Sequence, residues 1–191
     1  KVTGVYSNKN DVWGVGINYA INGDNFTDGN YKFSFWKASD KSASSVIGVS
    51  FKIYDKADAE KVNWDLGYSD ISGAFTKTEI AFGVTHNESG VVITCGEKTL
   101  ETETFGQLRI QLYFGGGANG EDNKRTDYLD DVTLVKEGAN PVGSDFAFNG
   151  WFCDYNGTGS EFVISDEKVH SGSHALKITN VYSNKNDVWG I

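Results

Sequence analysis

The sequence predicts an all-β protein, an antiparallel β-sandwich or jelly roll. Three observations support this fold class. Apolar and polar residues alternate with a period of two in several segments, as they do in strands that bury one face. Clusters of Gly, Asn, Asp and Ser separate these segments and are typical of turns. No helical pattern longer than about one turn is present, and we expect the nearest candidate, KADAEK at 56–61, to be a loop.

The alternation defines four strands most clearly. In chain order they cover residues 31–36, 47–54, 108–114 and 128–135. In the first three, every second residue is bulky and apolar, and we expect these residues to fill the core. The turn signals that flank or separate the strands are NGDN at 22–25, TDGN at 27–30, NESG at 87–90 and GGGANG at 115–120.

Composition narrows the range of partners. The chain has 191 residues, the length of one large all-β domain, and a formal net charge of -9 at pH 7. Phosphate backbones repel such a surface, so we expect no nucleic-acid partner. No apolar run approaches the roughly 18 residues that span a bilayer, so we expect no membrane insertion. Neither a signal peptide nor an initiator Met is present, and we expect a mature or excised part of a secreted or cell-surface protein.

Two cysteines, Cys95 and Cys153, are present. They can pair in an extracellular protein, but two cysteines at this separation do not by themselves predict a disulfide. Neither CxxC nor HExxH occurs, so the spacing does not predict a zinc site.

The two ends of the sequence are nearly identical. Residues 1–15 read KVTGVYSNKNDVWGV and residues 177–191 read KITNVYSNKNDVWGI, with twelve of fifteen positions the same. Two accounts fit this duplication: a tandem array with a period near 176 residues, or a circular permutant with one duplicated strand. In both, residues 1–135 supply the later strands of a module and 136–144, with the single Pro, form a linker. Residues 145–191 then supply the first strands of the same or the next module.

One copy of the duplicated segment is surplus to a single module in either account. An unpaired strand is a template for pairing, so residues 1–15 or 177–191 can pair with a neighbouring chain. The duplication therefore supports an alternative function, a self-assembling or tandem surface or fibre protein joined by the duplicated strand.

Several short motifs carry a family resemblance once the chain is read from residue 145 to its end and then from its start. In that order the motifs are Phe146 with Gly150-Trp151, Ser171-Gly172 with Leu176-Lys177, Trp13, the segment from Gly29 to Trp36, and Asp130-Asp131-Val132. Their order resembles jelly-roll carbohydrate-binding modules of the family four, nine, sixteen and twenty-two type. The resemblance implies a two-sheet jelly roll, attached to polysaccharide-active enzymes or surface proteins, with no chemistry of its own.

The strand at 108–114 offers the main binding candidates. Arg109, Gln111 and Tyr113 share the face opposite its apolar residues. Sugar rings stack on aromatic side chains, and sugar hydroxyls need planar polar partners, so this set suits a polysaccharide or oligosaccharide in a groove on one sheet. The resemblance places binding residues at the same strand and favours a plant cell-wall β-glycan, xylan or β-glucan. The alternative is a solvated outer face that binds nothing.

Three further aromatic residues are binding candidates. Tyr54 lies on the polar face of its strand and lines either the groove or its back. Trp36 lies opposite the apolar residues of its strand, and Trp64 lies near an expected loop or strand edge, where it suits the rim of a groove. For each the alternative is a structural role.

The resemblance also implies one structural calcium ion. Such modules bind it through a carboxylate near the domain start, an Asp of the Asp-Asp-Val strand and backbone carbonyls. Asp130 or Asp131 matches the Asp of the Asp-Asp-Val strand. Near the domain start, Ala147 stands where the family usually has Glu, and Asp145 is the carboxylate that can substitute for it. Calcium takes six to eight oxygen ligands, so carbonyls must contribute as well. The alternative is that Asp130 is a capped Asp at a strand edge.

Nothing in the sequence predicts an enzyme. No pair of carboxylates stands out for glycoside hydrolysis, and no nucleophile motif accompanies a histidine. His170 and His174 flank a predicted turn instead of lying on a helix, so their spacing does not predict a metal site.

Overall fold

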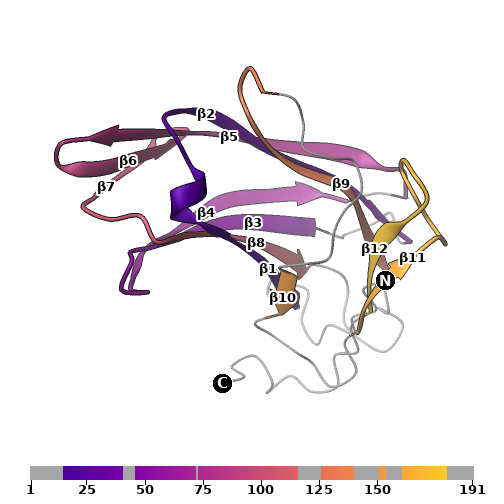
Figure 1. Cartoon of the computed structure of the whole chain (residues 1–191). Coiled ribbons are helices and arrows are strands. Elements are labelled where there is room, and N and C mark those ends of the chain that lie inside the picture. The colour runs from indigo at the N-terminus through magenta and orange to yellow at the C-terminus, as the bar shows by residue number, and fades with distance from the viewer. Residues whose placement is uncertain are drawn as a thin grey trace, which may run out of the picture.

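The computed structural model describes residues 15–40, 46–71, 73–115, 126–139, 151–153 and 161–179. They form a β-sandwich of two antiparallel sheets (Figure 1). Among them, no helix is long and apolar enough to cross a membrane. The predicted fold class is confirmed.

The first sheet, here called sheet A, contains five strands among the described residues. Their spatial order is β10 (Trp151–Cys153), β1 (Val15–Asn22), β8 (Gln107–Gly115), β3 (Val46–Tyr54) and β4 (Glu60–Asp70). The second, sheet B, has the order β11 (Glu161–Ser165), β12 (Ala175–Thr179), β9 (Asp127–Lys136), β2 (Gly29–Ser39), β5 (Thr76–Asn87), β6 (Gly90–Cys95) and β7 (Lys98–Thr102).

The apolar residues predicted by the alternation form the core between the sheets. Phe33 and Phe35 from β2 face Phe51 and Ile53 from β3, and all four are at most 1% exposed. Leu108, from β8, is buried with them. Burying apolar area in this way contributes about 25 cal/mol per Å² and is the main force that holds the two sheets together.

Of the expected turns, 22–25 and 87–90 connect neighbouring elements, 27–30 is a bend that runs into β2, and residues 116–120 lie outside the described residues. Residues 22–25 form a short 3-10 helix, Gly23–Asn25, because the Asn22 side chain accepts the Asp24 N–H at 2.9 Å. The segment 56–61 forms no helix: it is a turn that runs into β4.

Strands that follow the predicted linker lie in the same two sheets as those that precede it. β10 pairs with β1, and β12 pairs with β9. Figure 1 shows the β11–β12 hairpin at one edge of sheet B beside β9, with which β12 pairs. Residues 1–14 and 180–191, which hold most of the duplicated segment, lie outside the described residues.

Candidate ligand-binding face

The face of sheet A that points away from the core is polar. Strand register brings one row of side chains from each strand onto this face, because directly paired residues of antiparallel strands point the same way. The rows in register are Asn22 with Gln107 and Tyr54, Ala20 with Arg109 and Lys52, Asn18 with Gln111 and Ser50, and Gly16 with Tyr113 and Gly48. This face therefore unites the predicted Arg109, Gln111, Tyr113 and Tyr54.

One end of the face, here called the open end, holds an aromatic ring and a guanidinium in contact. The Arg109 guanidinium lies over the Tyr54 ring, 4.1 Å from its centroid, and Arg109 Nη1 lies 3.4 Å from the Tyr54 hydroxyl. Both residues are half-buried. A cation over an aromatic face is worth about 0.5–1 kcal/mol where water has access.

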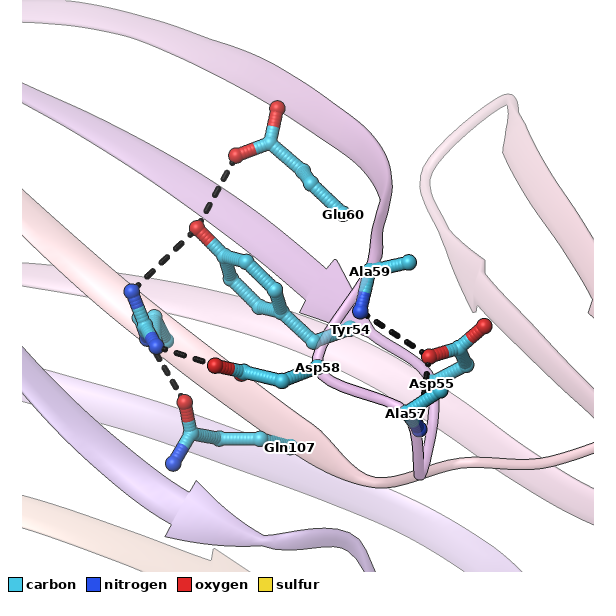
Figure 2. A network of polar contacts seen from close by, with 8 residues as sticks. Tyr54, Asp55, Ala57, Asp58, Ala59, Glu60 and Gln107 are labelled. Atoms are coloured by element: carbon cyan, nitrogen blue, oxygen red, sulfur yellow. Dashed lines mark hydrogen bonds and ion pairs between the residues drawn. The ribbon is translucent and has the colours of Figure 1, made fainter.

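Three planar polar groups surround this pair (Figure 2). Arg109 Nε–H donates to Gln107 Oε1 at 2.6 Å, and Arg109 Nη2 lies 3.5 Å from Asp58 Oδ1. The Tyr54 hydroxyl donates to Glu60 Oε2 at 2.9 Å. The open end therefore presents acceptors, donors and an aromatic ring together, with the Asp58 side chain 77% exposed.

A tight turn between β3 and β4 positions the carboxylates of Asp58 and Glu60. Asp55 Oδ1 accepts the backbone N–H groups of Ala57 and Ala59 at 2.8 and 2.9 Å, and the Asp55 carboxylate pairs with Lys61 at 2.7 Å. The Lys61 ammonium and these N–H donors hold the pKa of Asp55 below its usual value. Asp58 adopts a φ of 61°, a left-handed conformation that Asp tolerates in turns.

The turn is packed against the connection that leads into β8. A Cβ at Gly106 would lie 2.1 Å from the Asp55 carbonyl oxygen, so only glycine fits there. Gly106 N–H donates to the Tyr54 carbonyl at 2.9 Å. These contacts fix the Asp55 turn beside Gln107 and Arg109.

An open pocket adjoins this arrangement. Its volume is about 300 Å³, and its lining residues include Asp58 and Gln107. The remaining lining residues are Asn22, Asp24, Asp55, Lys56 and Gly106. The open end thus combines the stacked Tyr54 ring and Arg109 guanidinium with an adjacent pocket.

At the other end of the face, here called the closed end, the side chains are buried. Gln111 is 0% and Tyr113 4% exposed, which corrects the expectation that both line an open groove. The Tyr113 hydroxyl donates to Gln111 Oε1 and lies 3.2 Å from Ser50 Oγ, so these polar groups satisfy one another. Asn18, beside them, is fully buried, and neither of its amide atoms has a hydrogen-bond partner among the described residues.

The two other predicted aromatic platforms differ in exposure. Trp36 is half-buried on the outer face of sheet B, and His170 stacks on its ring with ring centroids 3.7 Å apart, as Arg109 stacks on Tyr54. Trp64 is 8% exposed and belongs to the core, because it pairs with Phe51 across β3 and β4 and shares its inward face. The prediction that Trp64 forms a rim is wrong.

The two aspartates predicted to bind calcium accept hydrogen bonds from backbone and side-chain donors. Asp130, 2% exposed, accepts the backbone N–H groups of Asp131 at 2.8 Å, His170 at 2.6 Å and Ser171 at 3.1 Å. Asp131 accepts His170 Nδ1–H at 2.7 Å and the Ser171 hydroxyl at 2.6 Å. All four carboxylate oxygens thus accept at least one hydrogen bond.

No described group of three or more His, Cys, Asp or Glu residues is arranged to hold a metal. Asp145, the third predicted ligand, lies outside the described residues. Cys95 is a buried free thiol, and its burial raises its pKa.

Sequence reasoning missed several residues of these two regions. Glu60 and Gln107 join the open end because their strands pair with β3 at Tyr54, and Asp58 joins it from the turn between β3 and β4. These contacts between segments leave no signal in the local sequence pattern. The Asp55 turn did have a local signal, since Asp followed by small residues is typical of a turn that its own carboxylate caps. His170 was read only as a turn residue, and nothing local points to its stacking on Trp36.

Comparisons with known proteins assign no family. No protein-family model matches the chain, and no curated protein matches it. Among solved structures, it is similar to the Clostridium thermocellum N-terminal endo-1,4-beta-D-xylanase 10B, in a structure of the CBM22-1–GH10 modules complexed with xylohexaose. The sequence identity is 13% and the TM-score 0.38; the match covers 66% of this chain and 20% of that chain.

Proposed function

We propose that this chain is a non-catalytic carbohydrate-binding module whose ligand lies on the open end of sheet A. The observation that carries the proposal is the Tyr54–Arg109 pair, half-buried and fixed beside Gln107, Asp58 and Glu60. The proposal also draws on the resemblance of the sequence motifs to jelly-roll carbohydrate-binding modules.

The chemistry of a sugar matches these groups. Pyranose rings present C–H groups on one face, and these groups pack against the negative face of an aromatic ring such as Tyr54. Sugar hydroxyls both donate and accept hydrogen bonds. Arg109 supplies donors only, the carboxylates of Asp58 and Glu60 supply acceptors only, and the Gln107 amide supplies both.

The geometry favours a neutral ligand. Arg109 carries one positive charge and the two nearby carboxylates carry two negative charges, so their sum of −1 disfavours an anionic sugar and is compatible with a neutral one. A plant cell-wall β-glycan, xylan or β-glucan first, is the neutral polymer that the resemblance favours. The resemblance also supports a secreted or cell-surface location, which we propose for this chain.

Titration calorimetry with soluble xylan, mixed-linkage β-glucan and mannan tests the function. We expect saturable binding to one glycan class with a Kd between roughly micromolar and millimolar, which corresponds to about 4–8 kcal/mol. Tyr54→Ala should abolish it, while Tyr54→Phe, which keeps the ring, should retain most of it. Phe75→Ala, which removes a half-buried ring outside the open end, is the matched control and should bind as the parent does.

The proposal fails if none of the three glycans binds at millimolar concentration. It also fails if Tyr54→Ala binds as tightly as the parent chain while circular dichroism shows that the variant is folded. In that second case the glycan binds elsewhere on the molecule.

A further inference from the structure

A second pocket lies beside the one at the open end of sheet A. Its volume is about 440 Å³, and it lies among the loops at one end of the sandwich. It is here called the loop pocket, and its lining residues come from four segments: 23–26, the turn at Lys56, 86–91 and 103–105. Asp24 and Lys56 also line the pocket at the open end, so the two pockets meet at this pair.

The boundary between the two pockets is a surface ion pair. Lys56 Nζ lies 2.9 Å from Asp24 Oδ1, and the two side chains are 58% and 66% exposed. An ion pair with this exposure contributes little to stability, so its side chains can turn to bond a ligand instead. The two pockets therefore form one groove that runs from the outer face of sheet A to the loops.

The backbone around the loop pocket is held by close contacts. A Cβ at Gly90 would lie 2.2 Å from the Thr102 carbonyl oxygen, so only glycine fits where these two segments meet. Gly23 N–H donates to the Gly106 carbonyl at 2.8 Å, which joins the first wall of the loop pocket to the connection beside Gln107. A groove with fixed walls binds a ligand without a large cost in loop ordering.

The loop pocket combines an apolar part with a polar rim. Phe26, Val91 and Phe105 line it and are at most 7% exposed, and the Phe26 and Phe105 ring centroids lie 5.3 Å apart. On the rim, the exposed Glu103 carboxylate supplies acceptors, and the Asn87 amide supplies both donors and an acceptor. Apolar surface next to planar polar groups is the combination that the C–H faces and hydroxyls of a sugar need.

The charge of the loop pocket matches that of the open end. Its lining residues include two carboxylates, Asp24 and Glu103, and one ammonium, Lys56, and with His86 counted as neutral they leave one net negative charge. The sugar site proposed above, with Arg109 and two carboxylates, carries the same net charge. A single neutral chain of sugars therefore suits both pockets, whereas both disfavour an anionic one.

We propose that the loop pocket is a second subsite for the same glycan, so that the module binds a run of consecutive sugar units across both pockets. This inference rests on the proposed function, because the glycan reaches the loop pocket from the open end. Asp24 and Lys56 contact the sugar unit between the two pockets, and Glu103 accepts hydroxyl hydrogen bonds in the loop pocket. The ligand is accordingly an extended oligosaccharide or polymer, and a disaccharide fills only part of the groove.

Titration calorimetry with xylo-, gluco- and manno-oligosaccharides, from disaccharide to hexasaccharide, tests the inference. We expect the hexasaccharide of the bound series to bind at least about tenfold more tightly than the disaccharide, because one hydrogen bond to a charged group contributes that much. Glu103→Ala should lower the hexasaccharide affinity by about tenfold and leave the disaccharide affinity unchanged.

Glu101→Ala is the matched control. It removes the same charge two residues away, on β7, from an exposed side chain that does not line the loop pocket, and it should bind both ligands as the parent does. Equal hexasaccharide affinity in the Glu103→Ala and Glu101→Ala variants would overturn the inference.

Amide shifts in proton–nitrogen spectra separate this inference from the proposed function. Saturating hexasaccharide should shift the backbone amides of Gly90 and Thr104, which line the loop pocket, and that of Gly106, which lines the pocket at the open end. If Gly106 shifts while Gly90 and Thr104 stay in place, the second subsite is overturned and the sugar site at the open end stands. If no hexasaccharide shifts any of the three, both proposals fall.

Discussion

The two ends of the outer face of sheet A have similar side chains but opposite environments. At the open end, Arg109 and Tyr54 are half-buried and surrounded by exposed carboxylates. At the closed end, on the same strand, Gln111 and Tyr113 are at most 4% exposed and bond to each other. The comparison shows that strand alternation determines which face a side chain occupies, whereas its exposure depends on what covers that face.

The largest expected effect is on stability at the closed end. Gln111→Ala removes the buried amide oxygen that accepts the Tyr113 hydroxyl, and the loss of a hydrogen bond between buried groups costs about 2 kcal/mol. Urea unfolding followed by fluorescence should show a lower midpoint with an unchanged slope. Gln107→Ala, on the same strand at the open end, should change stability by less than about 0.5 kcal/mol. Equal losses for the two variants would remove the distinction between the ends.

The next effect is on binding at the open end. Arg109→Ala removes the donor that stacks on Tyr54, and we expect glycan affinity to fall about tenfold, or about 1.4 kcal/mol. Arg109→Lys should not restore affinity, because an ammonium lacks the planar fork of the guanidinium. Calorimetry measures both variants, and a full recovery by Lys would show that only the charge matters.

A smaller effect concerns the buried amide of the closed end. Asn18→Leu replaces a fully buried amide, which has no hydrogen-bond partner among the described residues, with an apolar side chain of similar size. Stability should rise by about 1 kcal/mol because the desolvated polar group is gone. Thermal unfolding measures this change, and a clear loss of stability would show that a bound water or ligand group satisfies Asn18.

Low pH should destabilise the Asp55 turn at the open end before it affects the closed end. Lys61 and the turn N–H groups lower the pKa of Asp55, so the stability that this carboxylate contributes is fully present above its unfolded pKa of about 3.9. It is lost as the pH falls through the lowered folded pKa. Amide shifts of Ala57 and Ala59 should therefore stay constant from pH 8 to about 5 and move at lower pH. Asp55→Asn should remove this transition, and its persistence in the variant would assign it to another group.

The smallest expected effect is that of calcium. Because donors occupy the oxygens of Asp130 and Asp131, we expect the same Tm in calcium chloride and in chelator. Differential scanning calorimetry in the two buffers checks this. An increase of several degrees with calcium would show that the ion displaces these donors.

The fold was predictable from the sequence because local patterns determine it. Alternation in residues 47–54 and 108–114 places the buried residues of β3 and β8 correctly. The site was only partly predictable, since the contact of Tyr54 with Arg109 depends on the pairing of β3 with β8, which is set by packing across the whole sheet. Trp64 was misplaced for the same reason, because its partner Phe51 lies in another strand.

The central claim is that the open end of sheet A contacts a sugar, and the side-chain N–H signal of Arg109 reports on it most directly. The chain has two arginines, Arg109 and Arg125, so a proton–nitrogen correlation spectrum contains two Arg Nε–H signals, and Arg109→Lys identifies one of them. We predict that a xylo- or gluco-oligosaccharide shifts the Arg109 signal in a saturable way and leaves that of Arg125 in place. Saturable binding that leaves the Arg109 signal unmoved would contradict this account.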